Sequence, residues 1–483
     1  MNQTSLPAAS RQRRTGLLVF GVLLLLCGSA TRAAAAETSP PPPPQAWRLQ
    51  DALGLPSWLT LAVENRVRYE SVDNQFRAGG KGGDQDVAIR SLVLLEASYA
   101  PFRLGAEMID GRAVLDDAGT SLDTSQVDTL DLLQAYIGWD QSDVAGSGLV
   151  AHVRGGRQTL NFGSSRLVAR SVSRNTITTF TGIDATLEAP AKWQLRGFYV
   201  LPVSRLPDQR PALDEDEIEF DREDSASYFT GVFLRSNQLP YGANLELYVY
   251  YLHEPNTNSE FATRHRRLFT PGLRLYAEPK VGQLDYELEG AAQTGSSRAS
   301  AARSDVVELD HLAHFSHVQV GYTFALPWSP RLLVQYDYAS GDASATDHDN
   351  GRFDTLFGER RFEFGPTGLW GAFARSNINS PGYRVLVKPY KTVTAFAGHR
   401  LFWLADSHDT WTTSGVKDAS GHAGKFIGNQ LEANVVWNVI PTSVTLEAGW
   451  AYLFKGRFAR SAPNAPTNQD DSSFFYAQTV LRF

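Results

Sequence analysis

The 483-residue sequence has 52 acidic and 45 basic residues, a net charge of −7, and 42% hydrophobic residues. This acidic balance gives no reason to expect a nucleic-acid partner, because such partners are bound through a surplus of Lys and Arg. From Trp58 onward no apolar run approaches ~18 residues, which excludes a membrane-spanning helix in that part of the chain.

Residues 1–36 are predicted to be a secretory signal peptide. A positive region with three arginines precedes the apolar run Leu17–Leu26, and Ala34, Ala35 and Ala36 offer small residues for cleavage. Cys27, the only cysteine, lies within this segment. A lipidated cysteine is the alternative, although the leucines before it are larger than the residues that such a site favours.

Residues 37–57 are predicted to be a Pro-rich periplasmic linker. The run Pro40–Pro44 favours a stiff, extended polyproline conformation, which fits poorly into a packed element. Residues 58–483 show no second linker and no change of composition, so we expect them to form one large unit.

A weak period-2 pattern recurs throughout this large unit. It is clearest in Leu59–Glu70, Leu284–Gln293, Leu431–Val439 and Val444–Phe454, where apolar residues alternate with charged or polar ones. The alternation predicts strands with one apolar and one polar face. A soluble sandwich would show the same pattern with its apolar side inward, so the pattern alone leaves two alternatives.

The connections between the predicted strands distinguish these alternatives. Short links alternate without interruption with long polar segments, and the alternation predicts eighteen strands. Short turns on the periplasmic rim and long loops on the extracellular rim are typical of an outer-membrane barrel. The predicted fold is therefore an all-β transmembrane antiparallel β-barrel of about 18 strands. The short links are residues 100–101, 140–148, 188–192, 237–243, 277–282, 325–330, 388–391 and 440–443. The long segments are residues 72–86, 111–128, 158–178, 203–227, 253–267, 293–316, 340–381, 405–428 and 455–472.

The end of the chain supports the same fold. Alternate residues from Phe475 to Phe483 form one apolar face of a final strand that ends in a terminal Phe. This resembles the C-terminal strand by which outer-membrane barrels are recognised for assembly, so the barrel-assembly machinery is an expected partner through Phe483. Many aromatic residues lie near predicted strand ends, which is typical of an interfacial girdle.

A barrel of roughly 16–18 strands encloses a water-filled lumen, so its polar faces line a pore. The period-2 pattern directs Arg66, Arg68 and Arg90 inward, together with Arg157 at the end of the fifth strand. The inward acids Glu64, Glu70 and Glu96 are candidate partners for these arginines. The alternative is that these charges only neutralise one another and touch no substrate.

One stretch differs because it contains no acid. Between Asp143 and Asp184 the chain carries five arginines and neither Asp nor Glu. Without a local partner, these guanidinium groups require water or an anion. The stretch is therefore either a solvated basic loop or part of a lumen that selects anions. Its arginines are Arg154, Arg157, Arg166, Arg170 and Arg174.

Several sequence segments together resemble the alginate export family of outer-membrane β-barrels. The resemblance begins with GRQTLNFGSSRLV (Gly156–Val168), followed by Asn175 and TFTGIDATLEAP (Thr179–Pro190). Further matches, in the order of the family, are YDYASGD (Tyr336–Asp342), FDTLFG (Phe353–Gly358), HRLFWLADSHDTW (His399–Trp411) and IGNQLEANVVWNV (Ile427–Val439). This chain departs from the family pattern at Ser173-Arg174 and Thr179–Gly182, where an aromatic, an Arg and an acid of the family are missing.

The resemblance implies an eighteen-stranded barrel whose electropositive, arginine-lined pore passes an anionic polysaccharide such as a polyuronate, with export as the expected direction. A porin that takes up anionic oligosaccharides or small anionic solutes is the alternative. Arg157 and Arg166 match the family motif and are the first candidates for pore arginines. The other predicted pore-lining residues are Arg66, Arg68, Arg90, Arg170 and Arg174.

Other sites are weakly indicated. Asp347, Asp349 and Asn350 could form a loose surface Ca²⁺ site, although Gly351 breaks the spacing of a calcium loop. The acidic run Asp214–Asp224 is either a solvated loop or a place where divalent cations bridge to lipopolysaccharide. No Gly-x-Ser-x-Gly elbow is present, so we expect no enzyme and no catalytic residue; a barrel phospholipase is the alternative.

Overall fold

The computed structural model of the chain describes residues 46–483 except 118–119, 121, 259 and 360. The predicted signal peptide, residues 1–36, and the predicted linker up to residue 45 lie outside the described residues. The first strand begins at Leu59, and strands continue to Arg482. In the described part of the chain, no helix has the length and apolar character needed to cross a membrane.

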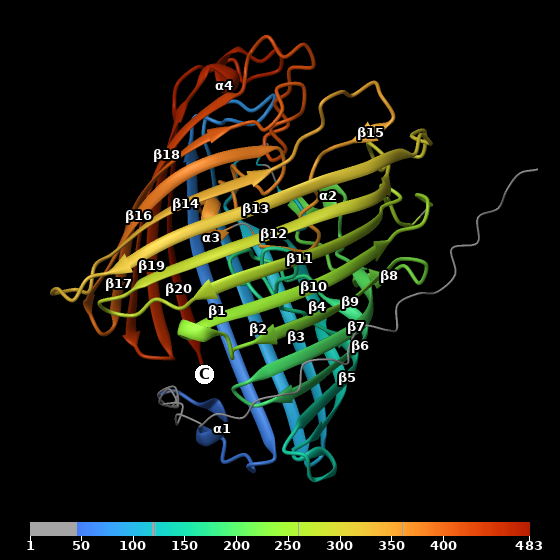
Figure 1. Ribbon diagram of the computed structural model, residues 1–483, viewed down its shortest axis with the longest axis vertical. Helices are drawn as coiled ribbons and strands as arrows, with labels where there is room; N and C mark the ends of the chain where they lie inside the picture. The colour runs from blue at the N-terminus through green and yellow to red at the C-terminus, as the bar shows by residue number, and fades with distance from the viewer. Residues whose placement is uncertain (1–45, 118–119, 121, 259, 360) are drawn as a thin grey trace, which may run out of the picture. The chain divides into compact units, whose positions relative to one another are not determined.

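Eighteen long strands form a closed antiparallel barrel (Figure 1). Each strand pairs with the next along the chain, and β20 closes the barrel against β1 in a register that runs from Glu64 opposite Arg482 to Asp73 opposite Ser473. The eighteen strands are β1 (Leu59–Asp73), β2 (Asp84–Tyr99), β3 (Phe102–Val114), β4 (Asp128–Gln141), β5 (Val150–Gln158), β6 (Phe180–Ala189), β7 (Trp193–Ser204), β9 (Tyr228–Ser236), β10 (Ala243–His253), β11 (Arg267–Ala277), β12 (Leu284–Ser297), β13 (Leu309–Thr323), β14 (Arg331–Ala339), β16 (Ile378–Tyr390), β17 (Val393–Trp403), β18 (Phe426–Ile440), β19 (Val444–Lys455) and β20 (Ser472–Arg482).

Short elements occur outside the barrel strands. The two-residue strands β8 (Arg222–Glu223) and β15 (Asp349–Asn350) pair with β7 and β13, respectively. The helices are α1 (Leu49–Ala52), α2 (Arg210–Asp214), α3 (Arg361–Phe364) and α4 (Arg457–Ser461), and the 3₁₀ turns are Val144–Gly146 and Pro240–Gly242.

The strands carry apolar side chains outward and polar side chains inward. In β1, for example, Val67 and Tyr69 are exposed, whereas the alternate residues Arg66, Arg68 and Glu70 are buried. A strand in a soluble sandwich would bury the opposite set. The apolar surface therefore requires a lipid environment, and the period-2 pattern of the sequence has its apolar side facing out.

The predicted alternation of short and long connections is present throughout the barrel. The short turns fall on one rim, where exposed aromatic side chains such as Tyr99, Phe102, Trp328 and Tyr390 gather near the strand ends. We call this the short-turn rim and the opposite one the long-loop rim. Aromatic rings at strand ends suit the boundary between lipid and water.

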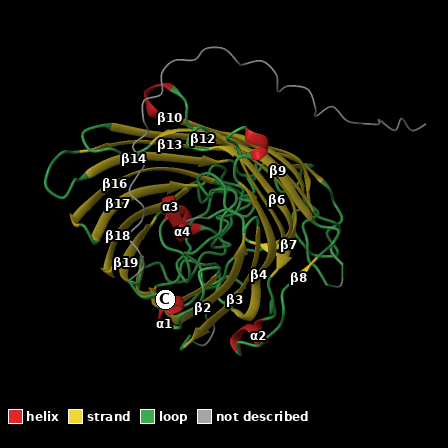
Figure 2. Ribbon diagram, turned by 90° about the horizontal axis from the view of Figure 1, so that it is seen from below, coloured by secondary structure: helices red, strands yellow, loops and turns green. Residues whose placement is uncertain are grey.

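The long connections are only partly polar, because several of them fold inward and form an apolar core. Phe76 stacks on Trp411 at 5.3 Å between ring centroids and packs edge-on against Trp370 at 5.1 Å. These three residues come from three different long connections. Figure 2 shows loops and helix α3 inside the ring of strands, so the lumen is partly occupied by the protein's own loops.

Candidate functional site

The connection between β5 and β6, residues 159–179, is bound to lumen arginines of the barrel wall. Arg66 donates hydrogen bonds to the carbonyl oxygens of Val172 and Arg174, both at 2.7 Å. Arg90 donates to the same carbonyl of Arg174 at 2.9 Å, and Arg68 donates to that of Ser173 at 3.2 Å. Three strand arginines thus hold the backbone of the acid-free stretch inside the barrel.

Asn175, the residue after Arg174, strengthens the same attachment. Its side-chain amide donates to the carbonyl oxygens of Gln126 at 2.7 Å, Arg112 at 3.0 Å and Ile89 at 3.1 Å, and its side-chain oxygen accepts from Arg66 at 3.1 Å. A buried Asn whose donors and acceptor are all used holds one backbone position strongly.

Arg166 lies at the centre of a buried ion cluster. Its guanidinium bonds to Glu287 and Glu289, both on β12, and to Glu363 of helix α3 at 2.8 Å. Only 4% of Arg166 is exposed. The stretch contains no local acid, as the sequence shows, but acids more than 100 residues away in the chain fold against Arg166 and neutralise it.

Glu363 attaches a second long connection, residues 340–377, to the same cluster. Its carboxylate also contacts Arg375 at 2.5 Å, and its carbonyl oxygen accepts from Arg400 at 2.8 Å. Arg400, on β17, in turn pairs with Asp337 on β14. Two long connections and the barrel strands β12, β14 and β17 therefore meet around Arg166 and Glu363.

The lumen contains two charged cavities with these connections between them. The long-loop cavity has a volume of about 690 Å³ and is lined by six arginines and two aspartates. The short-turn cavity has a volume of about 730 Å³ and is lined by eight arginines and six glutamates. The long-loop set is Arg77, Arg174, Arg264, Arg266, Arg298, Arg352, Asp123 and Asp354. The short-turn set is Arg66, Arg68, Arg90, Arg166, Arg274, Arg331, Arg384, Arg482, Glu64, Glu287, Glu359, Glu363, Glu432 and Glu447.

Both cavities are thus positive in a chain whose net charge is −7. Most of the positive charge in the short-turn cavity is compensated locally. Arg90 lies 2.8 Å from Glu64, Arg274 lies 2.8 Å from Glu287, and Arg384 lies 3.1 Å from Glu432. Counted over the lining side chains, the surplus of positive charge is larger in the long-loop cavity, although Arg266, Arg298 and Arg352 also pair with acids there.

Arg264 carries uncompensated charge in the long-loop cavity. Among the described residues its guanidinium makes no hydrogen bond and no ion pair, whereas Arg266 beside it pairs with Glu254 at 2.6 Å and Asp354 at 2.8 Å. Burial lowers the pKa of Arg264, a sign that its charge is poorly solvated. An anionic ligand would supply the counter-charge and the hydrogen-bond acceptors that the described residues do not offer to Arg264.

The structure brings four of the predicted pore residues to one cavity: Arg66, Arg68, Arg90 and Arg166 line the short-turn cavity. Arg174 lines the long-loop cavity. Arg170 lines neither of them and pairs with Glu107 at 2.8 Å.

Arg157 is placed on the outward face of the barrel wall. It lies opposite Thr181 in the strand register, and Thr181 shares its face with the exposed Ile183. Both Arg157 and Thr181 bond to Glu223 of β8, which lies at the long-loop rim. Arg157 therefore lines neither cavity and helps to hold the connection that contains Glu223.

Sequence reasoning did not single out most of the arginines of the long-loop cavity. Arg264 and Arg266 belong to the sequence RHRR at residues 264–267, a basic cluster beside a predicted strand that could have drawn attention. Arg298 and Arg352 stand alone in polar connections and carry no such signal.

A closed antiparallel barrel with an apolar outer face and a charged lumen defines a β-barrel protein of the Gram-negative outer membrane. Residues 57–470 match the model of the alginate export family, described as "Alginate export", and the chain belongs to this family. No curated protein sequence matches the chain.

Solved structures with the same fold include three outer-membrane proteins of Pseudomonas aeruginosa. OccD3 (OpdP) is 10% identical, with a TM-score of 0.55 over 88% of this chain and 91% of its own. OpdK, solved with vanillate, is 11% identical, with a TM-score of 0.55 over 88% and 98%. OprD is 10% identical, with a TM-score of 0.53 over 88% and 94%. At these identities the likeness concerns the fold.

Proposed function

We propose that the protein is a passive outer-membrane channel through which an anionic polysaccharide of the polyuronate class leaves the cell. The observation that carries this proposal is the surplus of arginine in both lumen cavities of an acidic protein. Membership of the alginate export family supports the same substrate class.

In this proposal the short turns face the periplasm and the long loops face the outside of the cell. The polymer would enter through the short-turn cavity, where most arginines already have a carboxylate partner, and leave through the more positive long-loop cavity. Conduction requires binding that is favourable enough for entry and weak enough for release. Arginines that exchange a protein carboxylate for a uronate carboxylate meet this requirement, because each step replaces one ion pair by another.

The connections around Arg166 and Glu363 must move for a polymer to pass, because they lie between the two cavities. Uptake of small anionic solutes is a second candidate function, and the same observation favours it. With both connections in place, the lumen offers two separate cavities of about 700 Å³ rather than a wide channel. A small carboxylate fits such a cavity without displacing them.

Both functions depend on the surplus of positive charge in the lumen, and ion selectivity in planar bilayers tests this property. A salt gradient across a single channel should give a reversal potential that shows preference for anions, and the preference should fade at 1 M salt, where the Debye length is about 3 Å. Preference for cations would contradict both functions.

A further inference from the structure

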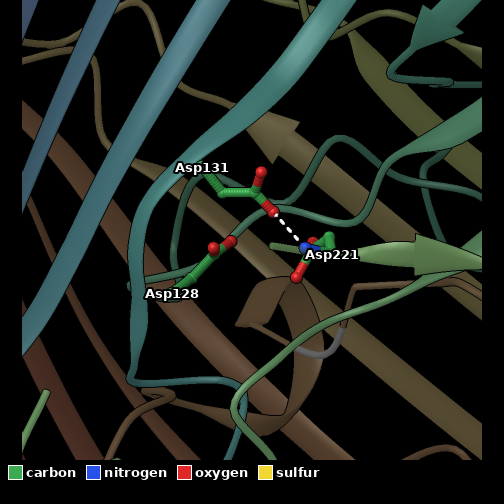
Figure 3. Close-up of side chains that lie close together, drawn as sticks. All are labelled: Asp128, Asp131 and Asp221. Atoms are coloured by element: carbon green, nitrogen blue, oxygen red, sulfur yellow. Dashed lines mark hydrogen bonds between the residues drawn. The ribbon is translucent and has the colours of Figure 1, made fainter. Parts of the chain in front are cut away.

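Three buried aspartates meet where β4 begins. Asp128 and Asp131 belong to β4, and Asp221 belongs to the connection of residues 205–227 that joins β7 to β9. One carboxylate oxygen from each of the three lies within 4.8 Å of the other two. Figure 3 shows the three side chains converging from the strand and from the connection. The exposed fractions of Asp128, Asp131 and Asp221 are 1%, 2% and 7%.

The hydrogen bonds of the protein satisfy this group only in part. Asp131 accepts from the backbone amides of Leu132 at 2.5 Å and Asp221 at 2.8 Å, and Asp221 accepts from the amide of Leu206 at 2.8 Å. Asp128 has a buried carboxylate oxygen that accepts no hydrogen bond from any residue that the structure describes. A buried carboxylate oxygen without a partner is costly, and this one points into a group of two further acids.

The nearby arginines Arg157 and Arg205 offset the negative charge of the group only in part. Arg157 comes no closer than 3.9 Å to Asp131 and makes its shorter bonds to Glu223 and to backbone carbonyls. Arg205 donates its hydrogen bond to the hydroxyl of Thr176 at 2.9 Å. Asp110 adds a further negative charge in the vicinity. The group therefore needs protons or a cation.

Protons are one way to relieve the repulsion. Burial, together with the charges of Asp128 and Asp131, raises the pKa of Asp221 to about 9. A cation that binds all three carboxylates would displace these protons at neutral pH.

We propose that Asp128, Asp131 and Asp221 form a binding site for a divalent cation of the Ca²⁺ type. Calcium binds oxygen ligands at about 2.3–2.6 Å, so two ligands on opposite sides of the ion lie up to about 5 Å apart. The three carboxylate oxygens lie within 4.8 Å of one another, so one calcium ion can contact all of them. Magnesium demands near-ideal octahedral geometry and gives up its water ligands reluctantly, so a group of three protein carboxylates suits calcium better.

The cation has a structural consequence. The ion would attach residues 205–227 to the start of β4 at the long-loop rim. The two carboxylates on β4 and the one on residues 205–227 would share one ion, so removal of the ion should release residues 205–227 from the barrel wall. The sequence pointed to Asp347, Asp349 and Asn350 for a loose calcium site. That site stays a prediction, and the group of three acids around Asp128 is separate from it.

Calcium binding to the purified, detergent-solubilised protein tests the site. The protein is treated with a chelator, and Ca²⁺ alone is titrated by calorimetry, with Mg²⁺ as the competing ion. Asp221→Asn is the main variant because it lies outside the barrel strands. Asp128→Asn is the second variant, and Asp347→Asn is the matched control in the other acidic connection. Slower gel migration after heating confirms that each variant is folded.

We expect one Ca²⁺ site per chain that Mg²⁺ fills more weakly. Asp221→Asn and Asp128→Asn should each weaken Ca²⁺ binding by about tenfold or more, because each removes a charged ligand. Asp347→Asn should leave that site unchanged. Protease should cut residues 205–227 faster after chelation in the native protein but not in Asp221→Asn. If folded native protein binds no Ca²⁺, or if Asp347→Asn removes the binding and Asp221→Asn does not, the proposal is wrong.

Discussion

Arg166 and Glu363 meet at 2.8 Å inside the barrel, although they lie on two different long connections. Each is almost fully buried, and each has further charged partners from the barrel wall or its own connection. This contact joins residues 159–179 to residues 340–377 between the two cavities. Whatever passes from one cavity to the other must do so around this pair or by separating it.

Glu363→Ala should loosen both connections. Loss of one partner from a buried, hydrogen-bonded ion pair typically costs about 3–5 kcal/mol, because the remaining charge stays buried. We expect larger and noisier single-channel currents, together with faster protease cleavage within residues 340–377. Glu219→Gln removes an acid from an exposed ion pair with Arg222 and should change neither measurement, because such pairs contribute about 0–1 kcal/mol. Unchanged currents in folded Glu363→Ala would show that this contact does not restrict the channel.

Arg264→Glu should reduce the preference for anions. The change replaces an unpaired guanidinium with a carboxylate in the long-loop cavity, where it raises the local concentration of cations. We expect the anion-to-cation permeability ratio from reversal potentials at low salt to fall by about twofold or more. Arg222→Glu makes the same charge change at a residue that lines neither cavity, so it serves as the control. Equal shifts in the two variants would indicate a general charge effect without a role for the cavity.

The sequence predicted the barrel wall well because its information is local. Period-2 alternation assigned Arg66, Arg68 and Arg90 to the lumen, and the succession of short and long connections predicted eighteen strands. The partners of Arg166 could not be predicted in the same way. They come from β12 and helix α3, and nothing in the local sequence indicates which distant acid will fold against an arginine.

The same limit applies to residues near the long-loop rim. Arg157 reads as inward by its place near the end of β5, but its register with Thr181 puts it outward and next to Glu223. Asp221 lies in an acidic run that looks solvated in the sequence, yet it is buried against Asp128 and Asp131. These contacts depend on the path by which the long connections fold back against the barrel, and the composition of a connection does not predict that path.

The pH dependence of the connection of residues 205–227 follows from Asp221. Its folded pKa of about 9 lies above its ordinary value of 3.8, so the folded state holds the proton more tightly than the open state. The stabilisation is fully present below about pH 4 and is lost progressively as pH rises toward 9. Without Ca²⁺, protease cleavage of this connection should therefore accelerate as pH rises from 5 to about 9. Asp221→Asn should flatten this dependence, and a slower rate at higher pH in the native protein would contradict the assignment.

The proposed orientation predicts which engineered cysteines react on intact cells. Cys27 lies in the predicted signal peptide, so the secreted chain offers no competing thiol if that segment is removed. Ala345→Cys, on the long-loop rim, should react with a membrane-impermeant maleimide added to intact cells. Ser142→Cys, on the short-turn rim, should react only after the outer membrane is broken. The reverse pattern would invert the orientation and exchange the two ends of the transport path.

The proposed substrate is an anionic polymer, and block of the single-channel current by added polymers is the sharpest test of this proposal. The protein is reconstituted in a planar bilayer, and polyuronate is compared with a neutral polysaccharide of the same length, at low salt and at 1 M salt. We predict that polyuronate interrupts the current at low salt, that the neutral polymer does so far less, and that high salt or Arg264→Glu weakens the block. Equal block by the two polymers, or none by polyuronate in a channel that conducts small anions, would contradict the claim and favour uptake of small anionic solutes.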